Sequence, residues 1–183
     1  MPESFLDPQK IVQSFDLRPG DHVADFGAGH GYFTLPMARA VGANGKVYAI
    51  DIQSTAIDVV RSSASREHLL NIVPLQADLD MPMGSRIKDG LMDFVAVHNV
   101  LFQAEHKDVM LGEAWRILRN GGRLAMIEWD GDDASAGALS LGPLLALRIK
   151  KEAARAYALD AGFEYDREFA AGSHHYGLLF VKK

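Results

Sequence analysis

Residues 22–31 read HVADFGAGHG, and this stretch decides the fold. Its first half, His22–Phe26, is a short run with the branched and aromatic residues typical of a buried strand. Glycines follow at every second position, and a helix-period segment begins at Tyr32. A strand that turns through glycines into a helix leaves bare backbone at the helix N-terminus, where a ligand can approach closely. The stretch therefore predicts a strand–turn–helix unit with a ligand at the turn.

The rest of the chain repeats this alternation of apolar runs and helix-period segments. We expect strands at 22–26, 46–50, 71–75, 91–97, 123–127, 165–169 and 176–181. We expect helices at 8–15, 32–41 and 54–69, around 110–118 and around 154–161. Asp7 and Ser54 are predicted to cap helices, and the run Asn120-Gly121-Gly122 is predicted to end one.

Repeated strand–helix alternation predicts an α/β fold with a parallel sheet that helices cover on both faces. Right-handed crossovers make this a doubly wound, mostly parallel sheet of seven strands, and we expect the last strand to be antiparallel. We expect one domain over residues 1–183, in which the helix within residues 1–20 covers the ligand site. Ligands of such sheets bind beyond the carboxyl ends of the strands. The residues that follow each strand therefore decide the function.

Composition excludes several classes of protein. The 183 residues include 24 acids and 19 bases, and a net charge of −5 argues against nucleic acid or anionic lipid as a partner. The absence of cysteine excludes disulfides, thiolate metal sites and a cysteine nucleophile, and it fits a reducing compartment. Residues 1–7 do not resemble a secretory signal, and the longest uncharged stretch, 134–147, is too short to cross a membrane. We expect a cytoplasmic protein without a membrane span.

The glycine turn departs from the dinucleotide-binding fingerprint. That pattern, G-x-G-x-x-G, requires a glycine at the position of Tyr32. The pattern here is D-x-G-x-G-x-G, from Asp25 to Gly31, and the leading carboxylate suits an ammonium group better than a pyrophosphate. The alternative is a glycine-rich turn that binds no ligand.

Acids follow the next two predicted strands. Asp51 lies about 20 residues beyond the glycines, where an acid typically accepts both ribose hydroxyls, or alternatively caps the next helix. Asp78 follows the third strand, where a carboxylate can accept from an adenine amino group. Asp80 competes with Asp78 for this role, and both also suit an ordinary turn.

Residues from about Val23 to Trp129 resemble the class I S-adenosylmethionine-dependent methyltransferases. The segments that carry the resemblance include VYAID (47–51), ADLDMP (77–82), DFV (93–95) and LGEAWRILRNGGRL (111–124). The last segment is similar to the L-x-E-x-x-R-x-L-K-P-G-G-R-L segment of the ubiquinone/menaquinone-type ("type 11") branch, with Asn120 in place of proline. The resemblance is specific for the cofactor and its Rossmann-like fold, and unspecific for the substrate.

The resemblance implies S-adenosylmethionine as cofactor and S-adenosylhomocysteine as product. It implies that Asp25 and the backbone of the glycine turn hold the methionine moiety and that Asp51 holds the ribose. Asp78 and the Leu79 backbone would hold adenine. The expected cofactor-binding residues are Asp25, Gly27, Ala28, Gly29, Gly31, Asp51, Ile52, Asp78, Leu79, His98 and Asn99.

His98 and Asn99 follow the fourth strand and would face the methyl group. Methyl transfer needs a base only when the nucleophile arrives protonated, and His98 is the candidate catalytic base because imidazole titrates near neutral pH. The alternative is that His98 only contacts the cofactor or packs in the wall. Residues that follow the fifth strand are the candidates for the acceptor side, namely Glu128, Trp129 and Asp130. Alternatively, Glu128 and Asp130 are ordinary polar residues at the end of a strand, and Trp129 packs in the core.

The sequence does not identify the methyl acceptor or the oligomeric state. We expect a small-molecule acceptor between residues 4–15, residues 128–143 and the last two strands, with a macromolecule as the alternative. The asparagine–proline–proline–aromatic motif of nucleic-acid amine methylases is absent after the fourth strand, where the chain reads HNVL (98–101). The basic residues at 148, 150, 151 and 155 fit a solvated helix face.

One metal site and two rival functions are alternatives to this interpretation. A metal site at His174 and His175 is not expected, because adjacent strand residues point to opposite faces. A module that binds S-adenosylmethionine without chemistry is one rival function. A nicotinamide-dependent oxidoreductase is the other, and Tyr32 argues against it.

Overall fold

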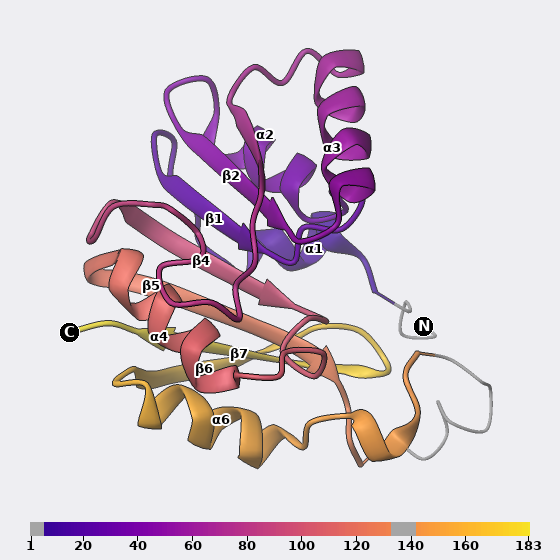
Figure 1. The fold of residues 1–183 in the computed structure, drawn as a ribbon, viewed down its shortest axis with the longest axis vertical. Coiled ribbons are helices and arrows are strands. Elements are labelled where there is room, and N and C mark those ends of the chain that lie inside the picture. The colour runs from indigo at the N-terminus through magenta and orange to yellow at the C-terminus, as the bar shows by residue number, and fades with distance from the viewer. Residues whose placement is uncertain (1–5, 133–141) are drawn as a thin grey trace.

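Seven strands form one sheet in the order β3-β2-β1-β4-β5-β7-β6 in the computed structural model, which describes residues 6–132 and 142–183 (Figure 1). The strands are β1 His22–Phe26, β2 Lys46–Asp51, β3 Ile72–Gln76, β4 Met92–His98, β5 Leu118–Trp129, β6 Glu164–Ala170 and β7 His175–Val181. The pairs from β3 to β5 are parallel, and β7 runs antiparallel to both of its neighbours. This arrangement confirms the predicted doubly wound sheet with an antiparallel last strand.

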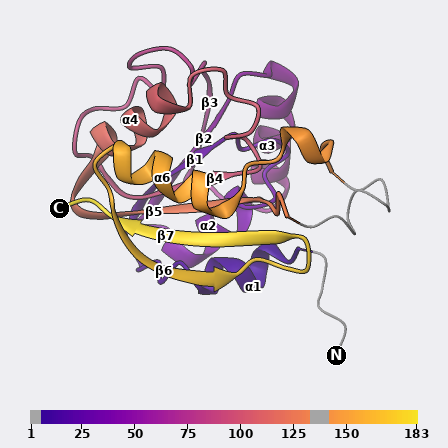
Figure 2. The same ribbon diagram turned by 90° about the horizontal axis from the view of Figure 1, so that it is seen from below.

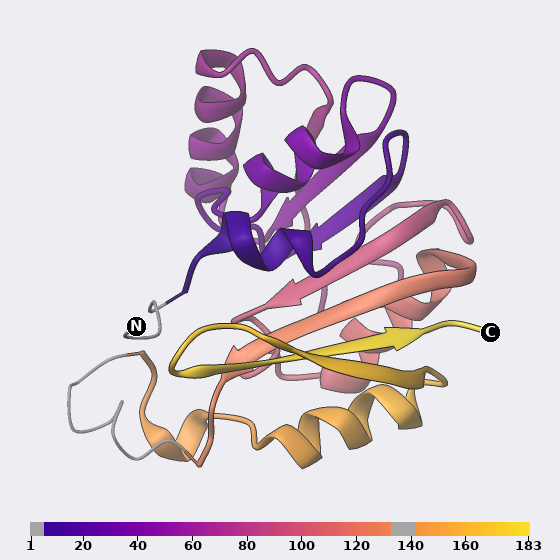
Figure 3. The same ribbon diagram turned by 180° about the vertical axis from the view of Figure 1, so that it is seen from behind.

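Helices cover both faces of the sheet. They are α1 Pro8–Gln13, α2 Thr34–Val41, α3 Ser54–Arg66, α4 Lys107–Ile117 and α6 Lys151–Asp160, with a short 3-10 turn at Leu145–Leu147. Figure 2 shows α6 and α1 on opposite sides of the sheet beside β7, and Figure 3 shows α1 and α2 in front of it. In the described ranges no helix is long and apolar enough to cross a membrane.

Alternation along the central strands divides the core into two layers. In β4, Val95 and Val97 pack in the layer that contains α4 and α6, whereas Phe94 and Ala96 pack in the layer that contains α1, α2 and α3. Successive strand residues point to opposite faces, so a fully apolar strand serves both layers. Because β1 to β4 are parallel, their carboxyl ends and the loops that follow them meet at one edge of the sheet.

The predicted helix ends at 15 and 69 and the predicted start at 32 are two to three residues off, and two further predictions are wrong, namely the helix end at 120–122 and the cap at Ser54. The helix before β5 does not end at residues 120–122, because α4 ends at Ile117 and β5 begins at Leu118. Gly121 and Gly122 exchange backbone hydrogen bonds with Lys182 just beyond β7, so this stretch is held as strand. Ser54 is the first residue of α3 and does not cap it, and the cap position makes no side-chain hydrogen bond.

The predicted cap of α1 is confirmed. A side-chain oxygen of Asp7 accepts hydrogen bonds from the backbone N–H groups of Gln9 and Lys10, at 3.1 and 3.4 Å. These bonds satisfy N–H groups that have no partner within the helix. The cap sets the start of α1, and Leu6 and Pro8 beside it line the cavity described next.

Candidate functional site

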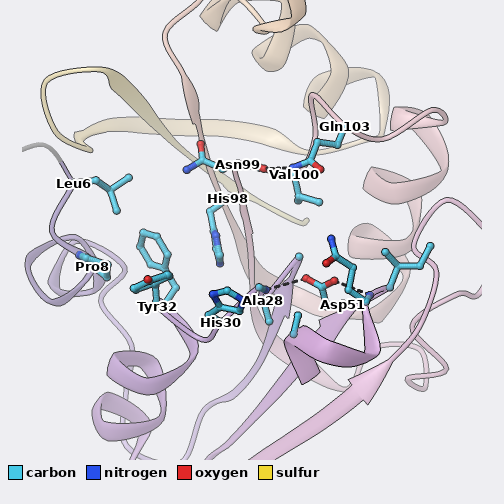
Figure 4. Close-up of a pocket in the computed structure, with 16 residues that line it drawn as sticks. Leu6, Pro8, Ala28, His30, Tyr32, Asp51, His98, Asn99, Val100 and Gln103 are labelled. Atoms are coloured by element: carbon cyan, nitrogen blue, oxygen red, sulfur yellow. Dashed lines mark hydrogen bonds between the residues drawn. The ribbon is translucent and has the colours of Figure 1, made fainter. Parts of the chain in front are cut away.

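A cavity of about 610 Å³ lies at the carboxyl ends of β1, β2 and β4 (Figure 4). A smaller hollow of about 220 Å³ extends from it past the end of β3. The two hollows share the lining residues Gly27, Asp51, Ile52 and Gln103. Their combined position matches the edge where doubly wound sheets bind ligands.

The glycine turn gives the cavity its floor. Gly27 has a φ of +72°, and a Cβ atom there would lie 2.6 Å from the Cβ atom of Val100. Gly29 has a φ of +51°, and a Cβ atom there would meet no atom within 4 Å. Gly27 is therefore required by packing inside the protein, whereas the missing side chain of Gly29 leaves open space for a ligand.

Asp51 joins the end of β2 to the glycine turn. One carboxylate oxygen accepts from the backbone N–H of Gly29 at 2.9 Å, and the other accepts from that of Gln53 at 2.9 Å. Asp51 is half-buried and lines both hollows. Each carboxylate oxygen has two lone pairs, so both oxygens can still accept hydrogen bonds from a ligand.

Asp78 and Asp80, the two candidates after β3, have different partners. Asp80 accepts from the backbone N–H groups of Glu105 and His106, at 3.0 and 3.1 Å, and so anchors the start of α4. Both acids line the smaller hollow, but among the described residues Asp78 accepts a single hydrogen bond, from the N–H of Asp80 at 2.9 Å. The geometry favours Asp78 over Asp80 for contact with a ligand.

Asp25 lies beneath the cavity and does not line it. Its side chain is fully buried, with one oxygen 2.6 Å from Nε2 of His98 and the other accepting the hydroxyl of Thr34 at 2.5 Å. The His98 ring does line the cavity and packs against Phe33, with ring centroids 4.3 Å apart (Figure 4). Asp25 and His98 are therefore brought together, with the imidazole nearer the cavity.

The loop after β4 begins with an unusual backbone. Asn99 has a φ of +52°, and its buried side-chain oxygen has no hydrogen-bond partner among the described residues. The backbone carbonyl oxygen of Asn99 accepts a hydrogen bond from the side-chain amide of Gln103 at 2.9 Å. Non-glycine residues uncommonly adopt this conformation, although asparagine does so more readily than most.

Glu128 is fully buried below the same loop. One of its oxygens accepts the backbone N–H groups of Val100 and Leu101, at 3.1 and 2.8 Å, and the other has no partner in the described parts of the chain. Burial raises the pKa of Glu128 to about 8, although the loop N–H groups oppose the shift. Glu128 thus supports the loop that carries Asn99.

The three predicted acceptor-side residues do not line the cavity. Neither Glu128, Trp129 nor Asp130 is among the lining residues, and Trp129 packs against His175 with ring centroids 4.2 Å apart. Their assignment to the acceptor side remains a prediction. Of the predicted walls, residues 4–5 and 133–141 lie outside the described residues.

Sequence reasoning missed several contributors from the turn before α2, the first residue of α2 and the loop after β4. They are His30, Tyr32, Phe33, Thr34, Val100 and Gln103. Tyr32 is 71% exposed, although it is a large aromatic residue, and this exposure was not visible in the pattern. The hydroxyl of Thr34 nine residues after Asp25 was a signal that could have been noticed.

In the part of the chain that the structure describes, the acids at this edge pair with no lysine or arginine side chain. Among the described residues, their hydrogen bonds come only from backbone N–H groups, Thr34 and His98. The acids concerned are Asp25, Asp51, Asp78 and Asp80. Such a cavity attracts a cationic ligand and disfavours a pyrophosphate. In the same parts of the chain, no three His, Asp or Glu residues are grouped so as to hold a metal ion.

Comparison with known proteins gives a consistent result. Residues 17–166 match the family model of a methyltransferase domain. A demethylmenaquinone methyltransferase of Symbiobacterium thermophilum is 30% identical over 122 residues, which cover 66% of this chain and 47% of that protein. The ubiquinone/menaquinone biosynthesis C-methyltransferase UbiE of Neisseria meningitidis serogroup C is 30% identical over 118 residues, or 64% of this chain and 46% of that protein. The chain spans just under half the length of these relatives.

The fold also matches solved structures. A SAM-dependent methyltransferase from Aquifex aeolicus superposes with a TM-score of 0.86 at 24% sequence identity, and the match covers 98% of this chain and 91% of that one. This similarity establishes a shared fold over almost the whole chain.

Proposed function

This chain belongs to the methyltransferase-domain family, as its resemblance to class I enzymes predicted, and we propose that it transfers a methyl group from S-adenosylmethionine to a small-molecule acceptor. The observation that carries this proposal is that the acids at this edge of the sheet have no lysine or arginine partner among the described residues. S-adenosylmethionine carries a positive sulfonium and a positive ammonium group, which such a cavity favours. The acids disfavour the negatively charged pyrophosphate of a nicotinamide cofactor.

The residues present fit this cofactor. The open space over Gly29 leaves room for it, and a cavity of about 610 Å³ is of ordinary size for a cofactor site. We assign the ribose hydroxyls to Asp51, adenine to Asp78 and the Leu79 backbone, and the methionine moiety to the glycine turn. When bound, S-adenosylmethionine supplies a methyl group on a positively charged sulfur, already activated for attack.

A small, largely apolar acceptor suits the described wall. Leu6, Pro8 and Tyr32 line the cavity on the side of His98 (Figure 4). Phe33 also lines the cavity and packs against the His98 ring. One relative is named as a demethylmenaquinone methyltransferase and another as a ubiquinone/menaquinone biosynthesis C-methyltransferase. These names support an acceptor of this kind. We assign the role of proton acceptor to His98, because it lines the cavity on this side.

Two further assignments belong to this proposal. We assign residues 1–183 to one methyltransferase domain, in which the segment before β1 covers the cofactor. Leu6 and Pro8 at the cavity support this cover. We also assign the protein to the cytoplasm, with which its cysteine-free composition is compatible.

Calorimetric titration with S-adenosylmethionine, S-adenosylhomocysteine and NAD tests the cofactor assignment. We expect the first two to bind and NAD not to bind. Asp51→Ala should weaken S-adenosylmethionine binding about tenfold or more, because unpaired ligand hydroxyls cost about 1–3 kcal/mol. Asp58→Ala, an exposed acid on α3 that pairs with Arg61, is the matched control and should bind normally. Equal affinity in wild type and Asp51→Ala would refute the ribose assignment.

Transfer of an isotopically labelled methyl group from S-adenosylmethionine tests the reaction. We expect label in small-molecule fractions of a metabolite extract and not in its protein or RNA fractions. Tight cofactor binding without transfer to any fraction would instead support a binding module without chemistry. Label in protein or RNA would move the assignment to a macromolecular acceptor.

A further inference from the structure

We propose that Asp25 is a positioning residue for His98: it fixes the imidazole with its proton on Nε2 and leaves Nδ1 to accept a proton from the methyl acceptor. The inference rests on the function proposed above. It assigns Asp25 a partner inside the protein, whereas the sequence had predicted that Asp25 holds the methionine moiety.

The pairing comes from neighbouring strands. Asp25 lies near the end of β1 and His98 ends β4, and the two strands pair in parallel. The Asp25 carboxylate oxygen lies 2.6 Å from Nε2 of His98, and both side chains are buried. An ionised carboxylate can only accept, so Nε2 must be the donor. In the neutral ring the other nitrogen, Nδ1, then carries the lone pair.

Residues at the start of α2 hold both members of the pair. The Thr34 hydroxyl donates to the second oxygen of Asp25 at 2.5 Å, which orients the carboxylate. The Phe33 ring packs on the His98 ring with an interplanar angle of 34°, which restricts the plane of the imidazole. Thr34 and Phe33 are themselves buried, so both restraints are rigid.

The exposure of the two acids separates their roles. Asp25 is 0% exposed, is absent from the cavity lining and has a protein partner on each oxygen. Asp51 lines the cavity, and its own partners are only backbone N–H groups. A ligand can therefore reach Asp51 directly, whereas Asp25 acts on a ligand only through His98.

The proton transfer is balanced within the cavity. When the acceptor is a hydroxyl, its O–H bond breaks, the electron pair stays on oxygen and a new N–H bond forms at Nδ1 of His98. The imidazolium that results lies beside the Asp25 carboxylate, which stabilises the new positive charge in a buried setting. Among the described residues Nδ1 has no hydrogen-bond partner, so no protein group competes for its lone pair.

Side-chain ¹⁵N NMR of histidine-labelled protein tests the pairing without any turnover. The chain has seven histidines, and His98→Gln identifies the signals of His98. At a pH where the ring is neutral, we expect a protonated Nε2, an unprotonated Nδ1 and a slowly exchanging ring proton. In Asp25→Leu the ring proton should exchange rapidly, and the two nitrogen shifts should move toward each other as the tautomers mix. The control variant Asp58→Asn, which changes an exposed acid, should leave the pattern unchanged.

The wild-type spectrum alone can overturn the proposal. A proton on Nδ1, or a ring proton that is unaltered in Asp25→Leu, would show that Asp25 does not fix His98. Should Asp25→Leu fail to fold, Asp25→Asn replaces it, and the ring proton should then shift upfield because a neutral amide is a weaker acceptor.

Cofactor affinity separates this proposal from the proposed function. We expect Asp25→Asn to change S-adenosylmethionine affinity by no more than about threefold, well below the loss expected for Asp51→Ala. A loss of about tenfold or more would show that Asp25 holds the cofactor and would refute the positioning role. Absence of S-adenosylmethionine binding in wild type, with the expected histidine pattern, would refute the proposed function alone.

Discussion

At the amino ends of the strands, buried Glu113 accepts hydrogen bonds from Arg116 and Ser85, whereas at the carboxyl ends buried Glu128 has only backbone N–H partners. Asp93 repeats the first pattern, with an Arg119 side chain 2.5 Å away. Both ends therefore contain buried acids, but within residues 6–132 and 142–183 arginine neutralises them at the amino ends alone.

The difference appears in how these acids titrate. Burial alone would raise the pKa of Glu113, yet the bonds from Arg116 and Ser85 hold it below its ordinary value. Burial dominates at Glu128 and raises its pKa to about 8. A neutralised acid stabilises the fold over the physiological range, whereas an acid without a cation costs stability once it ionises. Buried acids therefore contribute less to stability at the carboxyl ends, where a ligand binds, than at the amino ends.

The largest expected effect is at the amino ends. Arg116→Met removes the guanidinium that pairs with Glu113 and Asp89 and leaves Glu113 ionised and buried. We expect a loss of about 3–5 kcal/mol in the free energy of unfolding, the cost typical of breaking one side of a buried pair. Urea denaturation at neutral pH measures it.

Arg61→Met is the matched control for this loss. Arg61 pairs with Asp58 on the exposed face of α3, where an ion pair is worth about 1 kcal/mol or less. Cofactor affinity should stay normal in both variants. Equal stability losses would contradict the distinction between buried and exposed pairs.

Glu128→Gln tests the other side of the comparison. The folded-state pKa lies above the ordinary value, so the contribution of Glu128 to stability is complete below about 4.5 and is lost as pH rises through about 8. Glutamine is neutral at every pH and keeps the oxygen that accepts from Val100 and Leu101. Relative to wild type, the variant should gain on the order of 2–4 kcal/mol between pH 5 and pH 9. Parallel stability curves for the two proteins would show that Glu128 does not titrate in this range.

Local patterns were sufficient to predict the sheet and the position of the cavity. The glycine turn and the strand-end acids are short-range features, because a strand that ends in a polar residue places it at the sheet edge. The Asp25–His98 pair was not predictable, since it joins residues 73 apart in sequence and depends on β1 lying beside β4. The burial of Glu128 depends likewise on the loop that folds over it.

Residues 120–122 were misjudged for a related reason. Asn-Gly-Gly suits a helix end when only neighbours along the chain are considered. In the protein, Gly121 and Gly122 pair with Lys182, which lies about 60 residues further on, and the strand prevails. Long-range backbone pairing thus overrode a local turn signal.

The smallest expected effect is also the most direct test of charge at the carboxyl ends. S-adenosylmethionine has a net positive charge near neutral pH, whereas S-adenosylhomocysteine, which lacks the sulfonium, has none. Acids without cationic partners should attract the first more than the second, and salt should screen this difference. Between about 50 and 500 mM NaCl we expect S-adenosylmethionine binding to weaken about two- to fivefold, and S-adenosylhomocysteine binding to change less than about twofold. Calorimetry at four salt concentrations measures both slopes, with Asp58→Asn as the control that should leave them unchanged. Equal slopes for the two ligands would mean that the acids at this edge serve only as hydrogen-bond acceptors, and the contrast between the two ends would then be one of stability alone.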